Sequence, residues 1–450
     1  MTKNKILFAA AECAPFVKVG GLADVAGSLP KALKKLGVDV SVIIPFYESI
    51  SIDEKDLDII KKDVEVSFAG KIEKVDLYKT ILPNSDVQLI LVSNKRYFSG
   101  DPYSGDKTRF IFFSKSIVET AGLMNFKTIH CHDWHTAIVP YLAKNTKTIF
   151  TIHNIAYQGV FDSETINLLI ESNFSDEINC MELGIENSDI VTTVSPNYAK
   201  EILTPEFGFG LEKTLNKRKD SLFGIINGID PDQFNPEKDK AIVQNYSFEK
   251  IDKRIINKEN LQRECFDSVD LEIPLIGMVT RIADQKGFNL IEEALPELMR
   301  LKLQLVILGT GTEYYEKILT NTSNKYSDKM FVKTSFDDLL ARKIYAGSDL
   351  FLMPSHFEPC GLGQMIAMSY GSLPIVREVG GLKDTVIPYG QEGATGFAFN
   401  EASSQALLKA VNTALNLFKE KSAWRKLQRD AMSRDFSWEN SAKEYLNLYR

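Results

Sequence analysis

A basic motif and an acidic residue lie far apart in the chain, and both are suited to group transfer. Arg281 and Lys286 follow a predicted strand and precede a predicted helix, where two cations would bind a diphosphate and stabilise its departure. Glu358, held between Phe357 and Pro359, is suited to accept hydrogen bonds from sugar hydroxyls or to face developing positive charge. The alternatives are ordinary surface charge for the two cations and a helix-capping or first-turn carboxylate for Glu358.

Two glycine pairs precede predicted helices. Gly20 and Gly21 follow the first predicted strand, with Lys18 just before them, and Gly380 and Gly381 stand at a similar place late in the chain. Glycine lets the backbone approach a phosphate, and a helix N-terminus offers free N–H groups with partial positive charge. The sequence therefore predicts that amides around both pairs face an anion. The alternative is that each pair only makes a tight strand-to-helix turn.

Four of the five histidines lie at or near two predicted strand ends. His130 and His132 would share one face of a strand, and Asp133 could cap the helix that follows. His153 and Asn154 come at the carboxyl end of the next predicted strand. A zinc site is one interpretation, but no second ligand group at zinc-like spacing appears. A polar strand end that lines a ligand site is the favoured interpretation.

Repeated βα units must position these residues. Short apolar runs alternate with amphipathic stretches along nearly the whole chain, which is typical of parallel sheets covered by helices on both faces. The predicted strands are 6–11, 39–44, 87–92, 127–131, 148–152, 190–194 and 222–226 in the first half, and 275–279, 304–308, 329–333, 349–353 and 373–376 in the second. We predict two Rossmann-like, doubly wound α/β domains that face each other across a cleft. Ligands of such sheets bind beyond the carboxyl ends of the strands.

The length of 450 residues indicates two or three domains. The stretch 234–270 is rich in Lys, Asp, Glu and Asn and is a candidate connection. We therefore predict an N-terminal domain at 1–250 and a C-terminal domain at 251–434. An amphipathic helix at 435–450 follows them.

Composition excludes several classes of partner. Lys+Arg 53 against Asp+Glu 60 gives a net charge of −7, so no global positive field attracts nucleic acid or anionic lipid. No apolar run approaches the roughly 18 to 20 residues that a membrane helix needs. The 5 cysteines are scattered and odd in number, which argues against a disulfide framework and predicts a reducing, cytoplasmic location.

Taken together, the motifs resemble those of the bacterial glycogen synthases and plant starch synthases, which are nucleotide-sugar glucosyltransferases of the two-lobed GT-B fold. Each motif alone is modest, and their order along nearly the whole chain is specific. The motifs that carry the resemblance are Lys18-Val-Gly-Gly-Leu-Ala-Asp24, His130-Cys-His-Asp-Trp-His135, His153-Asn-Ile-Ala-Tyr-Gln-Gly159, Asn227-Gly-Ile-Asp230, Asp284-Gln-Lys-Gly287, Phe357-Glu-Pro-Cys-Gly-Leu362, Gly380-Gly-Leu-Lys-Asp-Thr385 and Phe436-Ser-Trp438.

The resemblance implies transfer of glucose from ADP-glucose, or UDP-glucose, to the non-reducing 4-hydroxyl of an α-1,4-glucan, with retention and without a metal or other cofactor. It implies that Arg281 and Lys286 bind the leaving diphosphate, that Glu358 contacts the glucose hydroxyls and that His153 lies beside the glucosyl group. It also implies that the closing helix returns to the first lobe. The other implied site residues are Lys18, Gly20, Gly21, Asp24, Cys360, Gly361, Leu362, Gly380 and Gly381 on the donor side, and Asp133 and Asn154 in the cleft or on the acceptor side.

Three departures from the family pattern and three alternatives remain. Val379 stands where threonine is common, His356 stands where arginine is common, and 94–109 is shorter than usual. One alternative is another GT-B transferase with a different acceptor, and another is a catalytically silent protein that binds a sugar nucleotide or a glucan. A dinucleotide-dependent oxidoreductase is disfavoured, because 308–312 lacks the third glycine of the fingerprint.

Overall fold

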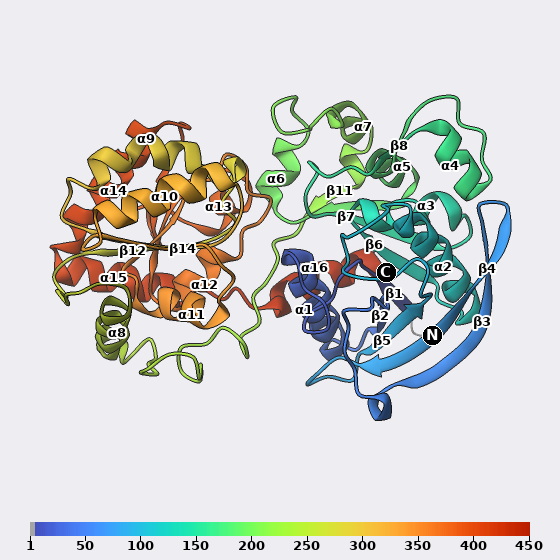
Figure 1. The fold of residues 1–450 in the computed structure, drawn as a ribbon, viewed down its shortest axis with the longest axis horizontal. Coiled ribbons are helices and arrows are strands. Elements are labelled where there is room, and N and C mark those ends of the chain that lie inside the picture. The colour runs from blue at the N-terminus through green and yellow to red at the C-terminus, as the bar shows by residue number, and fades with distance from the viewer. Residues whose placement is uncertain (1–4) are drawn as a thin grey trace. The chain divides into compact units, whose positions relative to one another are not determined.

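The computed structural model describes residues 5–450, and the chain divides into two compact units. Unit 1 comprises Met1–Gly228 and Trp438–Arg450, and unit 2 comprises Ile229–Ser437. Figure 1 shows unit 1 in blue and green with a red terminal helix, and unit 2 from yellow to red. The final helix therefore belongs to the unit formed by the N-terminal half of the chain.

Unit 1 is built on a nine-stranded sheet in the order β11-β10-β7-β6-β1-β2-β5-β4-β3. The pairs among β11, β10, β7, β6, β1, β2 and β5 are parallel, and β3 and β4 add an antiparallel edge. The strands are β1 (Lys5–Ala9), β2 (Asp39–Pro45), β3 (Asp58–Phe68), β4 (Lys71–Ile81), β5 (Gln88–Ser93), β6 (Thr128–His132), β7 (Lys147–Ile152), β10 (Ile190–Thr193) and β11 (Leu222–Gly224). A separate short pair consists of β8 (Val160–Phe161) and β9 (Ile178–Asn179). Sequence analysis missed β3 and β4, because most of their residues are exposed or half-buried and the apolar run is weak.

Helices cover the sheet of unit 1. They are α1 (Gly21–Lys35), α2 (Arg109–Leu123), α3 (Val139–Leu142), α4 (Ser163–Ile170), α5 (Cys180–Asn187), α6 (Pro196–Glu201), α7 (Glu212–Lys217) and α16 (Trp438–Tyr449). The last of these packs against α1, and its Trp438 is buried. The Nζ atom of Lys147 donates to the Leu448 carbonyl at 2.9 Å, which fixes the end of α16 to β7.

Unit 2 contains a six-stranded, fully parallel sheet in the order β14-β13-β12-β15-β16-β17. Its strands are β12 (Leu275–Val279), β13 (Gln304–Leu308), β14 (Met330–Lys333), β15 (Leu350–Met353), β16 (Leu373–Arg377) and β17 (Phe397–Phe399). Its helices are α8 (Ile255–Cys265), α9 (Phe288–Leu298), α10 (Glu313–Lys325), α11 (Asp338–Gly347), α12 (Gly363–Ser369), α13 (Gly380–Thr385), α14 (Ser404–Phe418) and α15 (Lys421–Met432). The three central strands β12, β13 and β15 are almost wholly buried apolar runs, as expected when helices cover both faces of a parallel sheet.

Both sheets are doubly wound. In unit 1 the chain runs outward from β1 through β2 to β5, and then returns to build β6, β7 and β10 on the other side. In unit 2 it runs from β12 to β14, and then builds β15 to β17 on the other side. Each sheet therefore has a point beside its first strand where the direction of winding reverses. The predicted pair of Rossmann-like α/β domains is confirmed.

The boundary between the units lies at Gly228/Ile229, earlier than the predicted boundary at 250/251. The polar segment that follows Ile229 belongs to unit 2 because it is hydrogen-bonded there. The Tyr246 hydroxyl donates to the Tyr370 carbonyl at 2.8 Å, and Asp239 pairs with Arg342 at 3.3 Å. A connection rich in charged residues is thus held to one unit by buried polar contacts that composition does not reveal.

Candidate active site

The predicted functional residues lie at the carboxyl ends of parallel strands at or near each reversal point, in the loops or in the first turn of the helix that follows. In unit 1 these loops follow β1, β6 and β7, and in unit 2 they follow β12, β15 and β16. In open α/β sheets this is the place where ligands bind.

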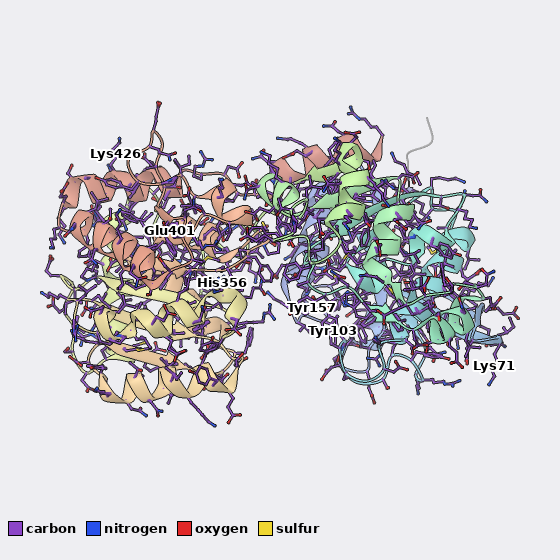
Figure 2. The ribbon with its side chains drawn as sticks, turned by 90° about the horizontal axis from the view of Figure 1, so that it is seen from above. Lys71, Tyr103, Tyr157, His356, Glu401 and Lys426 are labelled. Carbon is purple, nitrogen blue, oxygen red and sulfur yellow. The ribbon has the colours of Figure 1, made fainter. Side chains whose placement is uncertain are left out.

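The loop after β1 is organised by a carboxylate that sequence analysis missed. Glu12 is 2% exposed, and its Oε2 accepts from the amides of Val19 at 2.6 Å and Gly20 at 3.0 Å. Burial raises the pKa of Glu12, and hydrogen bonds from these amides and the Tyr103 hydroxyl oppose that rise; Figure 2 labels Tyr103 in unit 1. The Gly20 amide is therefore used by a carboxylate of the protein itself, whereas Gly21 begins α1 with open space where a Cβ would lie.

The two charged residues that flank this glycine pair contact each other. The Nζ atom of Lys18 lies 2.7 Å from Oδ1 of Asp24, and both side chains are partly exposed. An exposed pair of this kind contributes little to stability. Exchange of one partner for a ligand charge therefore costs little folding free energy.

Asp133 joins the loops after β6 and β7. Its Oδ1 accepts from the amides of His153 at 2.7 Å and Asn154 at 3.2 Å. The predicted side-chain cap of the helix that follows is wrong, because the side chain makes no cap hydrogen bond to η2 (Trp134–Thr136). Burial raises the pKa of Asp133 to about 7, and the two amide hydrogen bonds oppose the rise. Asn154 in turn accepts from the Ala156 amide at 3.1 Å.

His130, His132 and His153 form a neutral group, in which the first two are buried and His153 is half-buried. The rings of His130 and His132 lie on one face of β6 with centroids 4.1 Å apart, and Nδ1 of His132 lies 2.9 Å from Nε2 of His153. His130 also contacts the Tyr449 hydroxyl at 2.7 Å through its Nδ1. Burial lowers the pKa of His130 and His153 to about 3, so both are uncharged at pH 7. Within residues 5–450, no group of three or more His, Cys, Asp or Glu side chains is arranged to hold a metal ion.

In unit 2, Lys286 and Glu358 form a direct ion pair. Nζ of Lys286 lies 2.6 Å from Oε2 of Glu358, and the two side chains are only 15% and 7% exposed. The Ser355 hydroxyl donates to the same oxygen at 3.0 Å. From the sequence, Lys286 was expected to bind a diphosphate and Glu358 to bind sugar hydroxyls. A direct ion pair between them was not predicted. Removing one partner of such a buried pair leaves the other charge uncompensated.

Backbone contacts hold the loop after β12 against the loop after β15. Within η5 (Asp284–Lys286), the Gln285 carbonyl accepts from the His356 amide at 2.9 Å, and Gln285 Nε2 donates to the Phe357 carbonyl at 3.3 Å. The exposed Arg281 donates through Nη2 to Gln285 Oε1 at 3.1 Å. The guanidinium of Arg281 is thereby tied to the same loop pair as Lys286 and Glu358.

The second glycine pair packs against the acidic loop. A Cβ at Gly380 would lie 1.9 Å from the Glu358 carbonyl oxygen, and one at Gly381 would lie 2.3 Å from the Cys360 carbonyl oxygen. The Gly381 amide donates to the Glu358 carbonyl at 3.1 Å. The Gly381 amide therefore does not face an anion as predicted, because it donates to a carbonyl of the acidic loop. The backbone of Glu358 is fixed by this contact.

The remaining predicted residues of unit 2 lie where the acidic loop enters α12. Gln364 Nε2 donates to the carbonyls of Cys360 at 3.1 Å and Gly361 at 2.8 Å. Cys360 is buried, Gly361 has a φ of +72°, and Leu362 directly precedes the helix. The side chain of Gln364 therefore sets the path of the backbone through this turn.

His356, in the loop after β15, contacts residues of its own unit. Its Nε2 lies 2.7 Å from Asn289 Oδ1, and its carbonyl accepts from Arg377 Nη1 at 2.7 Å. Burial, with a smaller effect of the Arg377 charge, lowers the pKa of His356. Figure 2 labels its position. Its ring is thus a neutral hydrogen-bonding group at neutral pH.

Comparison with known proteins decides the family. Residues 5–217 match the starch synthase catalytic domain, and residues 267–430 match the glycosyl transferases group 1. A glycogen synthase of Thermosipho melanesiensis is 43% identical, with 99% of this chain and 98% of that protein covered; one of Alkaliphilus metalliredigens is 43% identical with 99% of both covered. The chain belongs to the glycogen and starch synthase family.

Solved structures agree with this family. The catalytic domain of starch synthase IV from Arabidopsis thaliana, bound to ADP and acarbose, matches with a TM-score of 0.92 and 34% identity over 100% of this chain and 99% of that one. Sucrose-phosphate synthase from Thermosynechococcus elongatus shares the fold, with a TM-score of 0.66 at 18% identity over 99% and 98% of the two chains. The predicted glycogen and starch synthase resemblance and the GT-B fold are confirmed, and the protein is a glycosyltransferase.

Proposed function

We propose that the chain transfers glucose from ADP-glucose to the 4-hydroxyl at the non-reducing end of an α-1,4-glucan, with retention at the anomeric carbon. Full-length similarity to glycogen synthases supports the glucan product. The ADP of the similar starch synthase IV structure supports adenine as the donor base.

The ion pair between Lys286 and Glu358, with Arg281 tied to the same loops, is the observation that carries the proposal. We assign Arg281 and Lys286 to the departing diphosphate, because charge-assisted hydrogen bonds to phosphate oxygens are strong and strengthen as negative charge develops. The Lys286 ammonium and the Ser355 hydroxyl both donate to Oε2 of Glu358. We therefore assign its Oε1 to a glucose hydroxyl.

The other assignments follow from hydrogen bonding in each unit. His153 is neutral and half-buried, which suits a contact with the glucosyl group. Asp133 holds the backbone of His153 and Asn154 rather than the ligand. On the donor side we keep Lys18, Gly20, Gly21, Asp24, Cys360, Gly361, Leu362, Gly380 and Gly381 as the residues that line or shape the binding loops.

The proposed transfer needs no reactant other than the sugar nucleotide and the glucan. The bond between the anomeric carbon and the phosphate oxygen breaks as the bond to the acceptor 4-oxygen forms on the same face of the sugar. The proton of the 4-hydroxyl passes to the departing phosphate oxygen, so ADP leaves and the glucan gains one residue. Cations on the phosphate side and oxygen acceptors beside the ring stabilise the charges that grow in this transition state.

We further propose that the enzyme works in a reducing, cytoplasmic environment. All five cysteines are buried and free in the structure, as is usual where thiols stay reduced. In the part of the chain that the structure describes, no helix is both long enough and apolar enough to cross a membrane.

A side-by-side transfer assay tests the proposal. The purified chain is incubated with glycogen and either ADP-glucose or UDP-glucose, and both nucleoside diphosphate release and glucose incorporation are measured. We expect incorporation from ADP-glucose at a kcat/KM roughly tenfold or more above that from UDP-glucose. Faster incorporation from UDP-glucose would overturn the donor assignment. Transfer to fructose but not to glycogen would indicate a different acceptor class, and no diphosphate release with any acceptor would indicate a silent binding protein.

A further inference from the structure

The ring of His132 is fully enclosed, yet only one of its nitrogens has a partner. Its Nδ1 lies 2.9 Å from Nε2 of His153, whereas its Nε2 has no hydrogen-bond partner among the described residues. The rings of Phe8 and His130 pack against it, with centroids 3.9 Å and 4.1 Å away. The two nitrogens of this one side chain therefore have very different surroundings.

Only two proton arrangements allow a hydrogen bond between Nδ1 of His132 and Nε2 of His153. Burial lowers the pKa of His132 well below its usual value and that of His153 to about 3, so each neutral ring carries one N–H. In the first arrangement His132 donates from Nδ1 to Nε2 of His153, and the unpartnered Nε2 of His132 holds only a lone pair. In the second, His153 donates, and His132 is left with a buried N–H that has no acceptor.

The first arrangement is favoured because an orphaned N–H is the rarer and costlier defect. Buried donors without an acceptor are less common in proteins than acceptors with an unused lone pair. Each unsatisfied buried group costs a desolvation penalty. The enclosure of Nε2 of His132 thus determines the direction of the hydrogen bond to His153.

We propose that His132 is a positioning residue that fixes His153 in the tautomer with its proton on Nδ1. Residue His153 is only half-buried, and its Nδ1 is not among the enclosed atoms that lack a partner. This N–H is therefore open to a ligand. It suits an oxygen acceptor such as a hydroxyl of the transferred hexose, and this part of the inference rests on the proposed function.

Two consecutive residues then hold His153 in place. Parallel pairing of β6 with β7 sets His132 opposite Thr151, which brings the rings of His132 and His153 within hydrogen-bonding distance. Asp133 accepts from the His153 amide at 2.7 Å. Asp133 thus fixes the main chain of His153, and His132 fixes its ring and the position of its proton.

Nitrogen NMR of the full chain shows directly which ring nitrogen of His153 carries the proton. With ¹⁵N-labelled histidine there are only five imidazoles, and the His153→Gln variant identifies the signals of His153. We expect His153 to be protonated on Nδ1 and not on Nε2, and His132 to show the same tautomer. A proton on Nε2 of His153 in the wild-type chain would overturn the inference.

A matched pair of variants tests the dependence on His132. The amide of His132→Asn retains an N–H donor near the position of Nδ1, so we expect His153 to stay protonated on Nδ1. His132→Leu removes the donor, so we expect a mixture of His153 tautomers and a donor KM raised roughly tenfold, with a smaller change in kcat. A role confined to packing predicts lower thermal stability in both variants and no change in the His153 tautomer, and that result would contradict the proposal.

The outcomes stay separate from those of the proposed function. If His132→Leu does not fold, the wild-type and His132→Asn spectra still decide the tautomer. The expected tautomer combined with no transfer from any glucose donor would overturn the proposed function but leave the positioning role of His132 intact. Transfer of glucose with His153 protonated on Nε2 would support the proposed function and overturn the positioning role of His132.

Discussion

The two glycine pairs look alike in sequence and differ in structure. At the start of α1, a Cβ at Gly21 would have no described atom within 4 Å apart from its chain neighbours and the backbone of its own helix. At the start of α13, Gly380 and Gly381 would place a Cβ 1.9 Å and 2.3 Å from carbonyl oxygens of the acidic loop. The first pair leaves room for a ligand, and the second lets two backbone segments of unit 2 touch. A Gly-Gly pair before a helix therefore does not by itself indicate an anion site.

The carboxyl edges of the two sheets also differ in the charge of their side chains. In unit 1 burial keeps His153 neutral and raises the pKa of Asp133 to about 7. In unit 2 opposite charges are paired directly between Lys286 and Glu358. A weakly charged edge suits sugar hydroxyls, and an edge with a largely buried ammonium beside an exposed guanidinium suits a diphosphate.

Removal of the buried ammonium is expected to have the largest effect. We expect Lys286→Ala to lower kcat roughly 10² to 10³-fold, because a preorganised charge on the leaving group is lost. The variant also leaves Glu358 buried without its cation, so the midpoint of thermal unfolding falls. Initial rates of ADP release in the presence of glycogen measure the first effect, and calorimetry measures the second.

Two further variants separate charge from folding. Lys286→Met combined with Glu358→Gln removes both charges, so stability recovers while turnover stays low. Lys421→Ala breaks the exposed pair with Glu272, at 2.9 Å, and we expect unchanged turnover. Equal losses of turnover in Lys286→Ala and Lys421→Ala would show that the buried pair has no special role.

The glycine comparison predicts opposite consequences for one added methyl group. Gly381→Ala drives its Cβ into the backbone of Cys360, so we expect a loss of about 3 kcal/mol or more of unfolding free energy. Gly21→Ala meets no neighbour, and we expect its stability to stay within about 1 kcal/mol of wild type. Urea unfolding of both variants measures the difference. A Gly21→Ala variant as unstable as Gly381→Ala would contradict the structural distinction.

Local sequence patterns predicted where most motifs lie, and they failed where the contacts are distant in sequence. Apolar periodicity and glycine placement located the loops that carry Arg281 and Glu358. They could not predict that Glu12 takes the Gly20 amide, or that Lys286 reaches Glu358, because these contacts depend on how loops fold back and how parallel strands align. The same limit applies to Asp133, whose carboxylate serves the loop after a different strand.

The carboxylate of Asp133 is expected to act by holding the loop after β7 in position, not by its negative charge. Asp133→Ala frees the amides of His153 and Asn154, so we expect kcat/KM to fall roughly thirtyfold through loss of the loop position. Asp133→Asn retains an oxygen that can accept from both amides, and we expect it to stay within about threefold of wild type. Steady-state kinetics on glycogen distinguishes them, and equal losses in the two variants would instead indicate a need for the negative charge.

The smallest effect concerns pH. His135 is buried among aromatic rings, and its Nδ1 has no hydrogen-bond partner within residues 5–450. Burial lowers its pKa to about 3. Because the folded pKa lies below the unfolded value, this residue costs stability as pH falls from about 6.5 toward about 3. We expect His135→Phe to gain about 2 kcal/mol relative to wild type at pH 5 and nothing from this source at pH 8. Urea unfolding at both pH values measures the gain, and an equal shift at both would contradict the assignment.

Isothermal titration calorimetry of ADP and AMP with wild type and Lys286→Ala tests whether the Lys286 ammonium binds the leaving phosphate. The two nucleotides differ only in the terminal phosphate, so the ratio of their affinities isolates the contact with the leaving diphosphate. We predict that ADP binds wild type roughly tenfold or more tightly than AMP and that this advantage collapses in Lys286→Ala, while AMP affinity is unchanged. An ADP advantage equally large in both proteins would contradict the claim that the buried ammonium of unit 2 binds the departing phosphate.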